Sequence, residues 1–293
     1  EPTGEDAKRA LARAYYRAGT LLTGITPPWG TLTGIRPAKR VGAMLASGMT
    51  AEEAADVLYR TCYTSPDKTR LCAEVAAAEA EALQKLDRQA VSVYIGIPFC
   101  PTRCSYCSFV SHSVEKEGRF IPAYVDALIE EIDETLGRLT VPVQSVYFGG
   151  GTPTTLSAGE LTRVMAAVSR HVDVGNLLEY TVEAGRPDTI TAEKLAAIRA
   201  GGADRISVNP QTTCDATLAA IGRTHSAADF FEAYALAKDF PVVNVDLIAG
   251  LPNETPEIFE KSLSDIIALK PANLTVHSLS LKRAARMQYA DMA

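Results

Sequence analysis

From residue 91 to residue 281 the sequence alternates strand-like segments, rich in β-branched and aromatic residues, with helical patterns. Six strands are predicted, at residues 91–97, 144–148, 177–184, 205–209, 242–248 and 274–281. Helices are predicted at 122–136, 157–171, 191–200, 213–221, 226–238 and 255–269. Such alternation indicates a parallel sheet, either open and doubly wound or curled into a barrel. In both cases the functional groups gather at the carboxyl ends of the strands.

The first third of the chain has a different pattern. Residues 5–89 are rich in alanine and read as helices, with a Gly/Pro-rich interruption at 23–37. Thr50 followed by Glu53 predicts a capping box that opens a helix running through Tyr59. We therefore expect an N-terminal helical region at 1–89 and an α/β core at 90–293.

Composition excludes several classes of function. The 293 residues carry 29 Lys and Arg against 35 Asp and Glu, a net charge of −6, which argues against an extended nucleic-acid surface. No apolar run approaches the roughly 18 residues of a membrane span, and the N-terminal sequence does not resemble a signal peptide. We expect a cytoplasmic protein. The chain begins at Glu1 without Met, which suggests a piece of a longer polypeptide.

Three of the six cysteines fall within eight residues, in a loop of pattern C-x3-C-x2-C after the first strand: Cys100, Cys104 and Cys107. This distribution is unlike a disulfide framework. Three close thiolates favour a metal or cluster. A [4Fe–4S] cluster would keep one iron open for another ligand, whereas a zinc site would need a fourth ligand, for which His112 is the nearest candidate. Three structural cysteines are the remaining alternative.

Other polar residues follow the predicted strands. Glycines at 149–151 follow the second strand, Glu183 ends the third, Gln211 follows the fourth, and Asp246 lies near the end of the fifth. Each has a plainer interpretation, because GGGTP can form an ordinary tight turn and a single carboxylate is often a helix cap or an ion-pair partner. Their common position at one rim nevertheless indicates a binding site.

The segment YIGIPFCPTRCSYCSF resembles the cluster loop of radical S-adenosylmethionine (SAM) enzymes, and within them most closely the oxygen-independent coproporphyrinogen III oxidase-like group, to which haem chaperones are related. The resemblance runs from about Val91 to Arg286 and includes GGGTPT, TVEAGRPDTIT, RISVNPQT, IGRTHS, NVDLIAGLPNET and LTVHSLSLKR. It implies a partial (βα)6 barrel of the radical SAM type.

The resemblance also implies two cofactors, a [4Fe–4S] cluster and SAM. Cys100, Cys104 and Cys107 would hold three irons, and SAM would chelate the fourth. Reductive cleavage of SAM would then give a 5′-deoxyadenosyl radical. The residues implied to contact SAM are Tyr94, Gly149, Gly150, Gly151, Thr152, Glu183, Gln211, Arg223, Asp246 and Leu279. Tyr94 would lie next to the SAM–cluster unit, so it is counted as catalytic together with the three cysteines.

Within that set, Glu183 and Asp246 would both face SAM, and one or both would bind the ribose hydroxyls. The Arg223 guanidinium would bind the SAM carboxylate in a bidentate manner. The alternative for Arg223 is a surface ion pair, the commoner fate of a lone arginine. Leu279 would offer a backbone contact to adenine.

The implied activity is oxidative decarboxylation of coproporphyrinogen III propionates to vinyl groups, giving protoporphyrinogen IX, as in a coproporphyrinogen dehydrogenase. An electron donor such as flavodoxin or ferredoxin would be needed. Two positions depart from the oxidase pattern, Phe109 in place of a further cysteine and Gly96 in place of a histidine. The first departure is shared with haem chaperones, so a haem-binding chaperone is the alternative function. A zinc-stabilised barrel that binds some other small molecule is the third hypothesis. The C-terminal substrate domain is expected to be missing from this chain.

Overall fold

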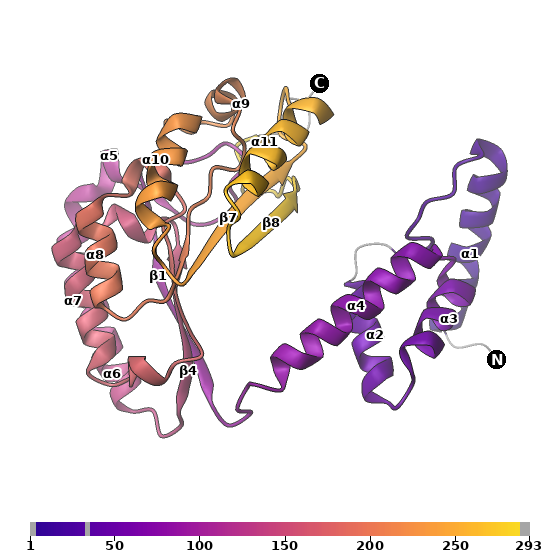
Figure 1. Cartoon of the computed structure of the whole chain (residues 1–293), viewed down its shortest axis with the longest axis horizontal. Coiled ribbons are helices and arrows are strands. Elements are labelled where there is room, and N and C mark those ends of the chain that lie inside the picture. Colours follow the sequence, from indigo (N-terminus) through magenta and orange to yellow (C-terminus); the bar gives the residue numbers. More distant parts are fainter. Residues whose placement is uncertain (1–3, 33–35, 288–293) are drawn as a thin grey trace. The chain divides into compact units, whose positions relative to one another are not determined.

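The computed structural model describes residues 4–32 and 36–287. By its internal contacts the chain divides into two compact units, the first ending at Asp87 and the second beginning at Arg88 (Figure 1). No helix in these described stretches is both long and apolar enough to cross a membrane.

The first unit is helical. Its helices are α1 (Gly4–Thr23), α2 (Pro37–Ala46), α3 (Ala51–Cys62) and α4 (Pro66–Leu83). The expected capping box is present, since Thr50 accepts from the Glu53 backbone N–H and Glu53 accepts from the Thr50 N–H, although α3 continues past Tyr59 to Cys62. A small core holds α2, α3 and α4 together, and it contains the free thiols Cys62 and Cys72.

The second unit contains a six-stranded sheet in which every neighbouring pair is parallel. Its strands are β1 (Val91–Ile97), β4 (Val143–Gly150), β5 (Glu179–Glu183), β6 (Arg205–Ser207), β7 (Val242–Ala249) and β8 (Asn273–Ser278). The spatial order β1-β4-β5-β6-β7-β8 follows the order of the strands in the chain. Each connection therefore places the next strand beside the previous one, always on the same side. This order is that of a partial barrel and excludes the doubly wound alternative, in which the order reverses.

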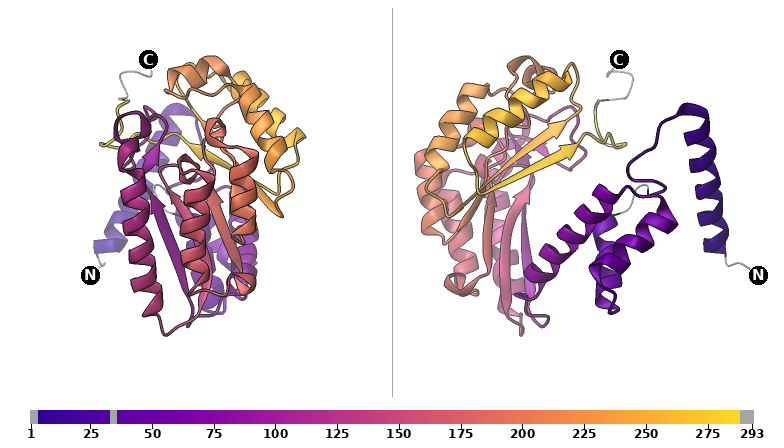
Figure 2. Two further views of the ribbon diagram at one scale, coloured as in Figure 1. Left: turned by 90° about the vertical axis from the view of Figure 1, so that its left-hand side faces the viewer. Right: turned by 45° about the vertical axis from the view of Figure 1, so that its right-hand side comes forward.

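Helices follow the strands along the chain. They are α5 (Val114–Glu117), α6 (Ile121–Gly137), α7 (Ala158–Ser169), α8 (Ala192–Ala200), α9 (Asp215–Ala220), α10 (Ala227–Ala237) and α11 (Pro256–Ala268). Capping boxes open α7 at Ser157 and α10 at Ser226. Helices α6, α7 and α8 cover one face of the sheet (Figure 2).

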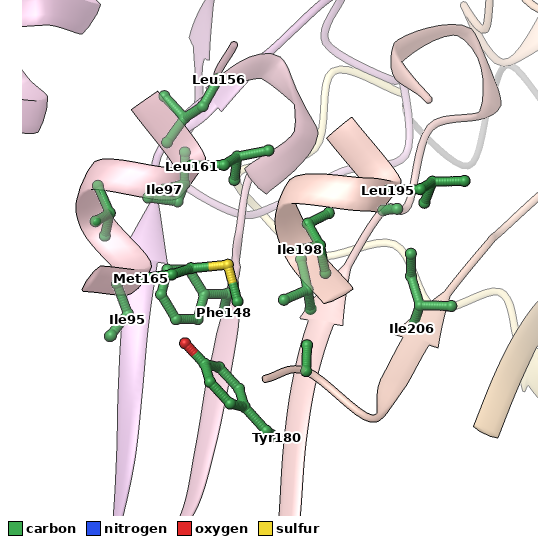
Figure 3. Close-up of a cluster of buried hydrophobic side chains, with 14 of the residues drawn as sticks. Ile95, Ile97, Phe148, Leu156, Leu161, Met165, Tyr180, Leu195, Ile198 and Ile206 are labelled. Atoms are coloured by element: carbon green, nitrogen blue, oxygen red, sulfur yellow. The ribbon is translucent and has the colours of Figure 1, made fainter. Parts of the chain in front are cut away.

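The main core lies between the sheet and this helical layer. Figure 3 shows Phe148 and Tyr180 of the sheet beside Met165 of α7, and Ile198 of α8 belongs to the same cluster. These four side chains are at most 1% exposed. The buried positions alternate with open ones along β1 and β4, so the opposite face of the sheet is free to carry polar side chains.

One small element is absent from the sequence prediction. Strand β2 (Phe99–Cys100) pairs in parallel with β3 (His112–Ser113), and this two-stranded ladder encloses the cysteine loop. The predicted strands at 177–184, 205–209 and 274–281 all end earlier in the structure, at Glu183, Ser207 and Ser278, because the residues that follow belong to the loops that form the rim.

Candidate active site

The cysteine loop is fastened to segments far away in the chain. The Ser105 N–H donates to the Ile221 carbonyl at 3.0 Å, and the Ser105 carbonyl accepts from the Met287 N–H at 2.8 Å. Thr102 Oγ1 donates to the Gly222 carbonyl at 3.0 Å. The loop is therefore supported by the segment after α9 and by the segment after β8, with Cys104 buried at 9% exposure.

The three thiols influence one another. Burial raises the pKa of Cys107, and the nearby Cys104 and Cys100 raise this pKa further. Among the described residues, no three or more His, Cys, Asp or Glu side chains are arranged so that they could hold a metal ion. His112, the candidate fourth zinc ligand, contacts the Glu117 carboxylate instead. By their chemistry, however, three free thiols in one short loop are the donor set that an iron–sulfur cluster takes.

The three glycines at the end of β4, of which Gly149 and Gly150 close the strand and Gly151 follows it, fit against the neighbouring strand and the cysteine loop. A Cβ on Gly151 would lie 2.6 Å from the Phe99 carbonyl oxygen, because the Gly151 N–H donates to the Ile97 carbonyl at 2.8 Å. Gly150 has φ +106°, a conformation that glycine adopts readily. Next to them, Thr152 Oγ1 lies 3.6 Å from Cys100 Sγ. The predicted turn thus supports the strand that leads into the cluster loop.

Gly149 brings two predicted SAM contacts together. A Cβ there would lie 2.8 Å from Tyr94 Oη and 3.0 Å from Glu183 Oε2. Tyr94 also stacks on Tyr147, with ring centroids 5.7 Å apart. Residues from β1, β4 and β5 therefore meet at the carboxyl ends of their strands, where a parallel sheet places its ligands.

The two carboxylates predicted to bind the ribose, Glu183 and Asp246, interact electrostatically with each other. Burial raises the pKa of Glu183, a hydrogen bond from Tyr147 lowers it, and Asp246 raises it. Asn244 Nδ2 donates to Asp246 Oδ1 at 2.8 Å, and His277 Nε2 lies 3.9 Å from Asp246 Oδ2. Within residues 4–32 and 36–287 neither carboxylate forms an ion pair with lysine or arginine, so both remain acceptors for a ligand.

Arg223 is buried at 7% exposure. Its Nη1 donates to the Asn209 carbonyl at 2.6 Å, and its Nη2 lies 3.4 Å from the Tyr106 hydroxyl. Burial lowers the pKa of Arg223, whereas Tyr106 and Cys104 raise it, with a net rise. The guanidinium is therefore charged, and a surface ion pair, the alternative from sequence, is wrong.

The buried polar atoms that lack a partner among the described residues include Arg223 Nε and Gln211 Oε1. Buried donors and acceptors are normally satisfied, so a polar ligand fits here. Gln211 has φ +72°, and its backbone bonds to Asp246 and Ile248 of β7. Leu279 bonds through its N–H to the Ala249 carbonyl at 2.9 Å. The Leu279 side chain packs on an apolar cluster that also contacts Tyr106, rather than on the group around Tyr94.

The inner face of the sheet is polar below this rim. Ser145 Oγ donates to Ser92 Oγ at 2.8 Å, and Asn244 Nδ2 donates to Ser207 Oγ at 2.7 Å. Closed eight-stranded barrels usually fill this space with branched apolar side chains. Here it is lined by further hydrogen-bonding residues, namely Glu179, Thr181, Arg205, Asn273 and Thr275.

Sequence reasoning missed three residues of this site. Tyr147 lies opposite Tyr94 in the β1–β4 register, and both tyrosines stand two residues before an inward glycine, which is a recognisable signal. Tyr106 lies between two of the cysteines and contacts Arg223. Arg186 contacts the cysteine loop from the segment after β5, and nothing in its local sequence indicates this.

Comparisons with known proteins agree with this geometry. Residues 94–266 match the profile of the "Radical SAM superfamily". The "Oxygen-independent coproporphyrinogen-III oxidase-like protein HemZ" of Bacillus subtilis is 41% identical over 97% of this chain and 58% of its own length. "Heme chaperone HemW" of the same organism is 34% identical over 64% of this chain and 50% of its own length.

Among solved structures, coproporphyrinogen III oxidase (HemN) from Escherichia coli superposes with a TM-score of 0.64 at 27% identity, over 74% of this chain and 51% of that one. The chain thus spans about half to three fifths of the length of these relatives. The expected parallel α/β fold and the resemblance to the oxygen-independent coproporphyrinogen III oxidase-like group, with the heme chaperones as relatives, are confirmed. The chain belongs to the radical SAM superfamily, whose members use a [4Fe–4S] cluster and SAM.

Proposed function

We propose that this protein is a radical SAM oxidoreductase in which Cys100, Cys104 and Cys107 hold the cluster and the neighbouring strand ends hold SAM. When bound and reduced, the cluster would supply the electron for reductive cleavage of SAM, the source of a 5′-deoxyadenosyl radical. The proposed substrate is coproporphyrinogen III. Two of its four propionates would each lose CO2, a hydrogen atom and one electron to become the vinyl groups of protoporphyrinogen IX, with SAM as the oxidant.

The observation that carries this proposal is the meeting of Tyr94 and Glu183 around Gly149, at the rim that also contains the cysteine loop. Gly149 leaves room there because a side chain would collide with both residues. In the proposal Glu183 and Asp246 accept hydrogen bonds from the ribose hydroxyls. Tyr94 faces the junction of SAM and cluster.

The remaining predicted contacts complete the SAM site. The charged and buried Arg223 suits the SAM carboxylate, because a guanidinium binds a carboxylate through two parallel hydrogen bonds. The unpartnered Gln211 Oε1 offers an acceptor. Thr152 and the backbone of Gly150 and Gly151 lie along the same rim, and a Leu279 backbone contact to adenine remains part of the proposal.

The substrate rests on the relatives' names and not on a pocket in this chain. HemZ is named as coproporphyrinogen oxidase-like and HemN as a coproporphyrinogen III oxidase. Because the chain covers only part of these relatives, we propose that a C-terminal domain specifies the substrate in the full-length protein. The cytoplasmic location and a flavodoxin or ferredoxin donor stay predictions.

The proposal is tested by product analysis on full-length, anaerobically reconstituted protein. With coproporphyrinogen III, SAM and reductant, the expected products are protoporphyrinogen IX, CO2, methionine and 5′-deoxyadenosine. The double variant Glu183→Gln/Asp246→Asn should lose these products while retaining the iron. SAM cleavage without any tetrapyrrole product contradicts the proposed substrate.

A haem chaperone is the second candidate, and one surface observation favours it. Phe109 and Val110, directly after the cysteine loop, are 70% and 82% exposed. An exposed apolar pair suits the flat face of a porphyrin. Stoichiometric haem binding that Phe109→Ser weakens, without substrate-dependent SAM consumption, would support the chaperone. Haem binding unaffected by Phe109→Ser would remove this argument.

A further inference from the structure

Arg186 is a buried arginine outside the set of predicted SAM contacts. It lies between β5 and the short helical turn at Pro187–Thr189 and is 3% exposed. Its Nε and Nη2 form a two-pronged pair with Asp188, at 3.1 Å and 3.0 Å. A guanidinium fixed in this way has little freedom to reorient.

The remaining donors of Arg186 reach two other segments. Nη1 donates to the Thr102 carbonyl at 3.2 Å and to Thr102 Oγ1 at 3.1 Å. Nη2 also donates to Thr224 Oγ1 at 3.1 Å, and this hydroxyl donates to Asp188 Oδ2 at 2.8 Å. Arg186 therefore joins the cysteine loop, the segment after β5 and the segment that carries Arg223.

The same Nη1 lies 3.9 Å from Cys104 Sγ, the most buried of the three thiols. Burying a charge is costly unless it is paired and hydrogen-bonded. Asp188 neutralises the buried arginine, yet the hydrogen bonds to Asp188 hold the positive end of the pair toward the cysteine loop.

We propose that Arg186 is a positioning residue for the cluster, which orients the cysteine loop and raises the reduction potential of the cluster through its charge next to Cys104. The inference rests on the proposed ligation by Cys100, Cys104 and Cys107. Reduction adds one negative charge to the cluster, and hydrogen bonds and charge near the sulfurs set the potential. A fixed cation at this place stabilises the reduced form.

The test is an anaerobic redox titration of the reconstituted protein without SAM, followed by electron paramagnetic resonance. Arg186→Gln leaves Asp188 uncompensated, so the equilibrium constant for reduction should fall about tenfold, a shift of about 59 mV to more negative values. Asp188→Asn leaves Arg186 uncompensated and should shift the potential the opposite way. A purely structural role would move both variants in one direction or in neither.

Two further variants serve as controls. Arg186→Lys keeps the charge and should keep the potential within about threefold of the wild-type equilibrium constant, which is less than 59 mV. Arg170→Gln removes an arginine that pairs with Asp133 on the helical layer, and it should leave the potential unchanged. Shifts of the same sign in Arg186→Gln and Asp188→Asn, or no shift in either, overturn the inference.

Cluster content separates the possible failures. Iron and sulfide are measured in every variant before the titration. A wild-type protein without iron and sulfide refutes the proposed ligation, whereas a loaded wild type with unmoved variants refutes only the role of Arg186. If Arg186→Gln does not bind the cluster, the potentials of Asp188→Asn and Arg186→Lys test the electrostatic role of Arg186. Loss of the cluster in both Arg186→Gln and Asp188→Asn shows a structural role and overturns the electrostatic one.

Discussion

The Tyr147 hydroxyl donates a hydrogen bond of 2.5 Å to Glu183 Oε1, and this bond joins β4 to β5 at the rim of the sheet. The tyrosine also stacks on Tyr94. It therefore orients a carboxylate that we assign to SAM binding, although Tyr147 is not itself one of the residues expected to contact SAM.

Tyr147→Phe tests this orientation. The hydrogen bond favours the ionised carboxylate, so its loss raises the pKa of Glu183 beyond the rise that burial already causes. Hydrogen bonds to charged groups contribute about 1.5–3 kcal/mol, and we expect SAM to bind about tenfold more weakly. Calorimetric titration of the reconstituted protein with SAM measures this change.

The matched control for Tyr147→Phe is Tyr180→Phe. Tyr180 lies on the neighbouring strand, is 1% exposed and has a hydroxyl without a hydrogen-bond partner in the part of the chain that the structure describes. Its removal should leave SAM affinity unchanged. Equal losses in the two variants would show that Tyr147 acts only through packing.

Gly151→Ala should destabilise the second unit. The new methyl group would lie 2.6 Å from the Phe99 carbonyl oxygen, and this atom belongs to backbone that pairs with β3. Overpacking of this kind costs about 1–3 kcal/mol. Gly159→Ala, where nothing lies within 4 Å of the new carbon, should be neutral or stabilise by up to about 1 kcal/mol. Denaturant unfolding compares them, and equal stabilities would contradict the close approach.

His225 makes stability depend on pH. Burial lowers its pKa to about 4, with Arg223 and Arg186 lowering it and Asp188 and Asp229 raising it. The unfolded chain takes up a proton below about pH 6.5, whereas the folded chain does not until about pH 4. Stability should thus fall by about 3 kcal/mol at most as the pH drops across this interval.

His225→Phe removes this loss, because the variant has no histidine to protonate at that site. Unfolding in denaturant at several pH values between about 4 and 7 should give a flatter profile than that of the wild type. His277→Phe, at a side chain 56% exposed, should keep the wild-type slope. A wild-type slope in His225→Phe would mean that other groups cause the acid loss.

Much of the fold could be predicted because its signals are local. The 91–97 strand matches β1 residue for residue, and the Thr50–Glu53 box forms as expected. The ladder of β2 and β3 could not be predicted, since each strand has two residues and depends on a partner across the cysteine loop.

The residues of the site likewise divide into those that could be predicted from the sequence and those that could not. Glu183 and Asp246 could be placed at the rim, because strand ends determine their position. Arg186 could not, since its contacts with Thr102 and Cys104 span 84 and 82 positions of the chain. The tight packing of Gly151 on Phe99 is likewise a tertiary contact, so a sequence motif indicates the glycine without its physical reason.

The most direct test of the whole account is iron and sulfide analysis, with electron paramagnetic resonance of the reduced protein, after anaerobic reconstitution. We predict about four irons and four sulfides per chain in the wild type and in Cys72→Ala, whose thiol lies in the core of the first unit. Cys104→Ala should lose the [4Fe–4S] signal. Zinc without sulfide in the wild type, or an unchanged cluster in Cys104→Ala, would contradict the account.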